Sequence, residues 1–105
     1  MELKIIPNGD EIVVALVGEL DQHEARKAMD AGERTALLYP SEQIVLDLSG
    51  LSFMDSSGLA VALSLHRQLV RTGRKLIVRH CPRQPLRVFR AAGIEKIIAF
   101  EEEAS

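Results

Sequence analysis

Short apolar runs alternate with longer amphipathic stretches along most of the chain. The apolar runs are rich in Ile, Val and Leu and lie at residues 3–6, 12–17, 44–48, 76–78 and 97–100. Each run is too short for a helix and predicts a largely buried strand. The turn signal Pro7-Asn8-Gly9-Asp10 separates the first two runs. We therefore expect the first two strands to be antiparallel neighbours.

Between the later strands the apolar positions take up helical spacing. This spacing predicts helices at residues 23–38, 56–72 and 85–92. Asp21 stands where the first helix needs an N-cap, and Pro40 ends that helix. Gly73 and Gly93 are the stops of the other two. The residues expected on the buried faces are Ala25, Ala28, Met29, Ala36 and Leu37, then Leu59, Ala62, Leu63, Leu69 and Val70, then Leu86, Val88 and Phe89.

The order of these elements predicts the fold. After the opening hairpin, strands and helices alternate, which implies right-handed crossovers between parallel strands. We expect one α/β domain over residues 1–105, with a single mixed, mostly parallel β-sheet and helices packed against it. Sites in such sheets lie beyond the carboxyl ends of the strands. The segments 18–21 and 49–57, which we expect to be loops, carry carboxylates and small residues at those ends.

Composition and charge narrow the class of protein. The 105 residues are 47% hydrophobic but only 4% aromatic, so the core is expected to be aliphatic. The net charge of −2 and the lack of paired aromatic residues argue against nucleic-acid binding. The residues after Asp55 contain more Lys and Arg than Asp and Glu, and this excess of positive charge is best explained by the solvated faces of helices. The single cysteine, Cys81, and the lack of a secretory leader or an apolar run of about 18 residues predict a cytoplasmic protein that is not in a membrane.

The segment Asp55-Ser56-Ser57-Gly58 stands where a strand passes into a helix. Short oxygen-bearing side chains suit this junction because they accept hydrogen bonds from the first amides of the helix. Capping explains one such residue, but not three in a row followed by glycine. An exposed serine at this point is also an accessible phosphoacceptor, since a phosphate would face free amides and the positive end of the helix dipole. The residues alone leave capping and modification open.

Three segments together resemble a known family. They are Gly18-Glu19-Leu20-Asp21, then Leu51-Ser52-Phe53-Met54-Asp55-Ser56-Ser57-Gly58-Leu59, then Ala91-Ala92-Gly93-Ile94. In order and spacing they resemble the STAS-domain anti-sigma factor antagonists, also called anti-anti-sigma factors, and most of all the sporulation members. The resemblance covers nearly the whole chain, and the Asp-Ser-Ser-Gly block is its most specific part. It implies a mixed sheet with helices, in agreement with the pattern of elements.

The resemblance also implies a function and a site. Members bind an anti-sigma factor that is a serine kinase and displace the sigma factor from it. The kinase supplies ATP-Mg and phosphorylates one serine, which releases the antagonist, and a phosphatase resets it. That serine corresponds to Ser56 here. Because the kinase supplies ATP-Mg, the antagonist is expected to need no cofactor of its own. The surroundings implied for the phosphosite and the partner are Asp21, Asp55, Ser57, Gly58 and Leu59.

Two other functions remain open. Similar domains serve as accessory subunits of lipid transporters or of stress-signalling complexes, where the same surface would bind an ATPase or a scaffold. A serine at a strand-to-helix turn also resembles a hydrolase nucleophile, although the leading glycine of that motif is missing. His23 would be its possible base. The histidines His23, His66 and His80 fit no metal-ligand spacing, and we expect neither a metal site nor catalysis.

Overall fold

The computed structural model describes residues 1–40 and 43–101 and contains one five-stranded sheet in the order β1-β2-β3-β4-β5. The strands are β1 Glu2–Asn8, β2 Glu11–Leu20, β3 Gln43–Met54, β4 Lys75–Arg79 and β5 Ala99–Glu101. β1 is antiparallel to β2, and every other neighbouring pair is parallel. The predicted α/β fold with a mixed, mostly parallel sheet is therefore confirmed.

The opening hairpin forms where the turn signal predicted it. Asn8 pairs with Glu11, which leaves Gly9 and Asp10 as a two-residue connection. Gly9 has φ +63°, a left-handed conformation that such tight turns demand and that glycine adopts without a steric penalty. The hairpin places β1 at the edge of the sheet and leaves the other side of β2 free to pair with β3.

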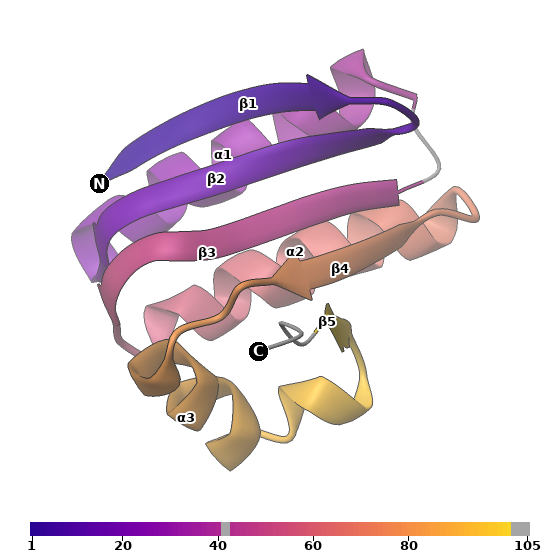
Figure 1. Cartoon of the computed structure of the whole chain (residues 1–105). Helices are drawn as coiled ribbons and strands as arrows, with labels where there is room; N and C mark the ends of the chain where they lie inside the picture. The colour runs from indigo at the N-terminus through magenta and orange to yellow at the C-terminus, as the bar shows by residue number, and fades with distance from the viewer. Residues whose placement is uncertain (41–42, 102–105) are drawn as a thin grey trace.

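Two long helices cover one face of the sheet, as Figure 1 shows. They are α1 (Gln22–Leu38) and α2 (Ser57–Arg71), while the shorter α3 (Arg83–Ala91) lies at one end of the sheet, beside β3. None of the helices in the described part of the chain has the length and apolar character needed to cross a membrane. A short 3₁₀ turn, η1 (Ile94–Lys96), follows α3. This turn makes the last strand begin at Ala99, two residues later than the apolar run predicted.

The core is aliphatic, as predicted, and lies between the sheet and the helices. Its largest buried side chains include Leu16, Ile44, Leu69 and Phe89, and Phe89 also packs edge-on against Phe100, with ring centroids 5.2 Å apart. Two predicted core positions are wrong. Leu37 is 79% exposed and Val70 is 53% exposed. Both stand near the last turn of their helix and directly follow a buried residue, Ala36 or Leu69, so they lie about 100° around the helix from the covered side.

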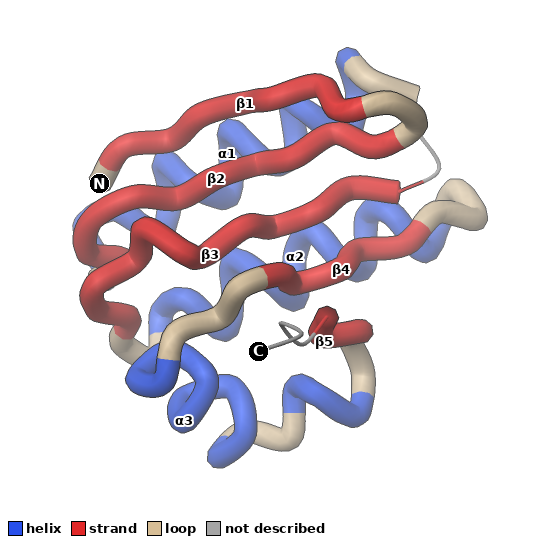
Figure 2. Tube along the Cα trace, in the orientation of Figure 1, coloured by secondary structure: helices blue, strands red, loops and turns tan. Residues whose placement is uncertain are grey.

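The segment predicted as a loop at 49–57 is mostly strand. β3 continues to Met54, and its register with β2 shifts twice, so that β3 gains an extra residue between the pairs Ala15–Asp47 and Val17–Gly50 and again before Glu19–Phe53. Each such bulge bends the strand and shifts its alternation of side chains. Figure 2 shows β3 curving onward after β4 has passed into a loop. The bulges hide the strand from a search for period-two alternation. The segment at 18–21 is likewise mostly strand, since β2 continues to Leu20.

An ion-pair network spans the face of the sheet away from α1 and α2. Arg79 on β4 donates to Glu11 on β2, with Nη1 2.8 Å from Oε1, and to Glu101 on β5, with Nη2 2.9 Å from Oε2. The hydrogen bonds from Arg79 lower the pKa of Glu11 below its usual value. The network links β4 to β2, which is not its neighbour, and to β5, where Glu101 is the register partner of Arg79.

Candidate functional site

The site is formed where β2 and β3 end side by side. Leu20 and Met54 are paired in the parallel register, and the Asp55 backbone amide donates to the Leu20 carbonyl over 3.1 Å. The next residues, Asp21 and Asp55, therefore leave the sheet together at its carboxyl edge. Each of them precedes a helix, α1 or α2. We call this edge, with Asp21, Asp55, Ser56 and Ser57, the rim.

The two aspartates both act as caps. Asp21 Oδ1 accepts from the backbone amides of His23 and Glu24, at 3.0 and 3.1 Å, which confirms the predicted N-cap of α1. Asp55 Oδ1 accepts from the Ser57 amide at 2.8 Å. Each carboxylate thus satisfies amides that the first turn of a helix leaves without partners, and lies near the positive end of that helix.

Ser56 occupies the position just before α2, but its side chain does not cap the helix. The residue is exposed, and its backbone is in the ordinary right-handed helical region, with φ −62° and ψ −16°. Because Asp55 provides the acceptor, the Ser56 hydroxyl has no part in starting the helix. Capping therefore does not account for this serine.

The amides of the first turn of α2 are already engaged. Besides the Ser57 amide held by Asp55, the Gly58 amide donates to the Asp55 carbonyl and the Leu59 amide to the Ser56 carbonyl, both at 3.1 Å. A phosphate on Ser56 would therefore not find the amides of Ser57, Gly58 and Leu59 free, in contrast to the expectation for this helix start. What remains at this point is the positive end of the helix dipole, set beside the carboxylate of Asp55.

The remaining predicted residues lie in the first turn of α2 and pack toward the core beneath the exposed Ser56. Ser57 is half-buried, Gly58 is buried, and Leu59 packs half-buried against the core. A Cβ at position 58 would overlap the Sδ and Cγ atoms of Met54. Met54 has no exposed surface, so its side chain can shift only within the core. Glycine is thus required for close packing of α2 on the end of β3, and its freedom in φ plays no part.

Gln84 holds the end of β3 and was not predicted. β4 pairs with β3 only as far as Asp47, so the outer edge of β3 beyond that residue has no strand beside it. Gln84, in the first turn of α3, supplies at Met54 the hydrogen bonds that a neighbouring strand would make. Its Oε1 accepts from the Met54 amide and its Nε2 donates to the Met54 carbonyl, each at 2.8 Å. No sequence signal identifies this contact, because the two residues are far apart in the chain and glutamine on a short helix is common.

The alternatives raised by the histidines gain no geometric support. His23 is exposed near the start of α1, and in the described structure no hydrogen bond joins its imidazole to the Ser56 hydroxyl. A hydrolase would need that base within reach of the serine. Within residues 1–40 and 43–101, no cluster of three or more His, Cys, Asp or Glu side chains could hold a metal ion.

The fold and the rim together place the chain in a family. The STAS domain family matches residues 2–105, and the chain belongs to that family. The sequence is 36% identical over 67 residues to the anti-sigma F factor antagonist of Paenibacillus polymyxa, a match that covers 64% of this chain and 57% of the relative. It is 30% identical over 71 residues to sulfate transporter 2.1 of Arabidopsis thaliana, which covers 68% of this chain and 10% of the transporter. The matches thus span a little over half of the first relative and a tenth of the second.

Solved structures agree with this assignment. The unphosphorylated form of the anti-sigma factor antagonist SpoIIAA superposes with a TM-score of 0.81 at 23% identity, covering 97% of this chain and 90% of that one. The phosphorylated form of the Bacillus cell fate determinant SpoIIAA gives a TM-score of 0.71 at 25% identity, with coverages of 97% and 93%. The protein therefore has the fold of these antagonists along nearly its whole length.

Replacing Gly58 tests the packing of α2 on Met54. Gly58→Ala should lower the free energy of unfolding by about 1–3 kcal/mol, because the added methyl overlaps the buried Met54 side chain, which must then shift within the core. Gly32→Ala in α1 is the matched control. There a Cβ would meet Leu65 at an ordinary 3.6 Å, so the change should be neutral or stabilising by up to about 1 kcal/mol. Urea unfolding of both variants measures the difference. Equal effects would show that the helix end is not packed as described.

Replacing Gln84 tests the contact that holds Met54. Gln84→Ala removes two hydrogen bonds and should lower the free energy of unfolding by about 1–3 kcal/mol. Gln84→Glu should cost at least as much, because a carboxylate oxygen would then face the Met54 carbonyl. Gln68→Ala is the control, since Gln68 makes one longer bond to the Glu33 carbonyl, at 3.2 Å. A Gln84→Ala variant as stable as Gln68→Ala would contradict the role given to Gln84.

Proposed function

We propose that the protein is an anti-sigma factor antagonist that acts in the cytoplasm by binding and not by catalysis. In its unphosphorylated form it binds an anti-sigma factor with serine kinase activity and thereby releases the sigma factor. Phosphorylation of Ser56 switches this binding off, and a phosphatase restores it. ATP-Mg is supplied by the kinase. A role in sporulation is part of the proposal, because one relative is named an anti-sigma F factor antagonist.

The observation that carries the proposal is the division of roles between Asp55 and Ser56. Asp55 caps the helix, and Ser56 is exposed with a hydroxyl that the fold does not use. A residue that can be changed without disturbing the helix start is suited to reversible modification. The existence of a phosphorylated form in a structurally similar antagonist supports the same conclusion.

The switch follows from electrostatics at the rim. A phosphate on Ser56 adds roughly 1.5–2 negative charges next to Asp55 and across the paired strand ends from Asp21. The end of the α2 dipole favours this charge, so the domain should stay folded. A partner pressed against the rim would instead meet a bulky, charged group. Phosphorylation would therefore act on the complex and leave the fold intact.

Incubation with a cognate anti-sigma kinase and ATP-Mg tests the proposal. Intact-mass and peptide mass spectrometry should find one added phosphate, on Ser56. Ser56→Ala should take up none and bind the kinase constitutively, and Ser56→Asp should bind at least tenfold more weakly than the unmodified protein. Ser57→Ala is the matched control, because it keeps the backbone amide that Asp55 holds, and it should still be phosphorylated.

Two results would contradict the proposal. One is the absence of phosphate when the kinase is active on another antagonist. The other is equal binding by Ser56→Ala, Ser56→Asp and the wild type.

A second candidate is a STAS domain that serves a lipid transporter or a stress-signalling complex by binding an ATPase or a scaffold. The match to part of a sulfate transporter favours it. In that case the rim would still be a contact surface, but partner binding would not depend on an anti-sigma kinase. Affinity purification from cells with and without that kinase separates the two candidates: the antagonist loses its principal partner, and the accessory domain keeps it.

A further inference from the structure

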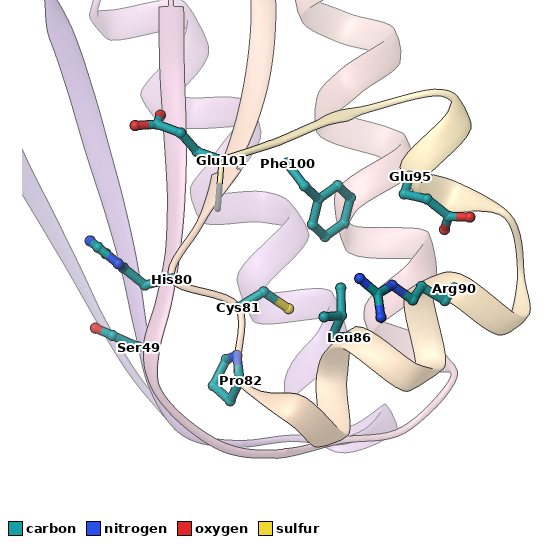
Figure 3. Close-up of a pocket in the computed structure, with 9 residues that line it drawn as sticks. All are labelled: Ser49, His80, Cys81, Pro82, Leu86, Arg90, Glu95, Phe100 and Glu101. Atoms are coloured by element: carbon teal, nitrogen blue, oxygen red, sulfur yellow. The ribbon is translucent and has the colours of Figure 1, made fainter. Parts of the chain in front are cut away.

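A cavity of about 680 Å³ lies beyond the carboxyl end of β4, and no residue of the rim lines it. α3 forms one wall and the last strand another, as Figure 3 shows. Its volume is within the range of pockets that hold small molecules, roughly 300–1,000 Å³. Its position follows the rule that parallel sheets bind ligands beyond the carboxyl ends of their strands. The proposed switch does not use this cavity.

The wall of the cavity is apolar on the side of α3 and β5. Pro82, Leu86 and Phe100 line it together with Cys81. Burial raises the pKa of the Cys81 thiol to about 11, so at neutral pH the group is uncharged and behaves as a small apolar surface. Figure 3 shows its sulfur directed into the space beside Leu86. This side of the cavity is thus fitted to a short hydrocarbon group.

One cation faces this apolar wall. Arg90, in the last turn of α3, turns its guanidinium toward Leu86 and Phe100 in Figure 3. It lies close enough to Cys81 to influence the thiol. Among the described residues no carboxylate forms an ion pair with Arg90, although arginine commonly pairs with one. The dipole of α3 also favours a cation near the C-terminal end of the helix, which is a purely structural reason for an arginine at this position.

Neither acidic residue that lines the cavity, Glu95 or Glu101, forms an ion pair with Arg90. Glu101 is held by Arg79, which donates to it at 2.9 and 3.3 Å. The Glu95 side chain is directed outward in Figure 3. A ligand that carried one negative charge would therefore find an accessible partner in Arg90, without having to displace a carboxylate of the protein.

We propose that this cavity binds a small organic monocarboxylate, with the carboxylate on Arg90 and the hydrocarbon chain against Pro82, Leu86 and Phe100. Both parts of the ligand are needed, because neither one exposed ion pair nor a short apolar contact gives measurable affinity alone. The site is independent of the proposed switch, and its occupancy is measured without any kinase.

Titration with hexanoate, followed by amide NMR shifts on the full chain, tests the proposal. We expect saturable shifts at Cys81, Leu86 and Phe100 with a Kd of roughly 1 mM. Hexanol, which lacks the charge, and acetate, which lacks the chain, should each bind at least tenfold more weakly. Arg90→Gln should weaken hexanoate at least tenfold. Arg87→Gln is the matched control, since Arg87 is exposed on the same helix outside the cavity, and it should bind like the wild type.

Three results would overturn the proposal. Absence of saturable shifts up to 50 times the expected Kd (about 50 mM) would show that the cavity is not a binding site for this class. Equal affinity for hexanol and hexanoate would show that the charge plays no part. An equal loss of hexanoate affinity in Arg87→Gln and Arg90→Gln would show that the basic helix attracts the anion in general. Arg90 would then serve only to complement the helix dipole.

Discussion

The geometry of the rim depends on how the end of β3 is held after β4 has left the sheet. A strand with one open edge exposes unpaired amides and carbonyls and is free to bend. Here β2 pairs with one side as far as Met54, and the Gln84 side chain occupies the other side at that same residue. Met54 is thereby fixed on both sides. Because Asp55 and Ser56 come next in the chain, their positions are fixed with it.

This constraint explains how a rigid site can present an exposed serine that the fold does not use. The helix start needs an acceptor, and Asp55 provides one from a residue that the sheet has already placed. Gly58 lets the first turn of α2 approach Met54 closely, so the helix start is packed directly on the end of β3. Ser56 then projects from a fixed frame without supporting it. On the proposed function, charge added there changes what can dock on the rim and leaves the domain folded.

Much of the fold could be predicted from the sequence because its elements follow simple rules. The hairpin turn, the N-cap at Asp21 and the alternation of strands and helices are all local signals, and each was confirmed. The bulged end of β3 was missed because two extra residues break the alternation that identifies a strand. Leu37 and Val70 were misplaced because each adjoins a buried residue, and helical spacing does not show how wide the covered side of the helix is. Gln84 could not be found at all, since its contact depends on tertiary structure.

The candidate site divides in the same way. The Asp-Ser-Ser-Gly block lies where the sequence placed it, at the start of α2, and the register of β2 and β3 brings Asp21 and Asp55 to the same edge as expected. The sequence could not show which side-chain oxygen of this block caps α2, because Asp55, Ser56 and Ser57 are all good caps.

Native-state hydrogen exchange is the most direct test of whether the end of β3 is held in place. The amides of Met54 and Asp55 should exchange as slowly as that of Leu16 in the core strand β2. Exchange as fast as in an unstructured peptide would show that the end of β3 is not fixed, and would contradict the account of the rim.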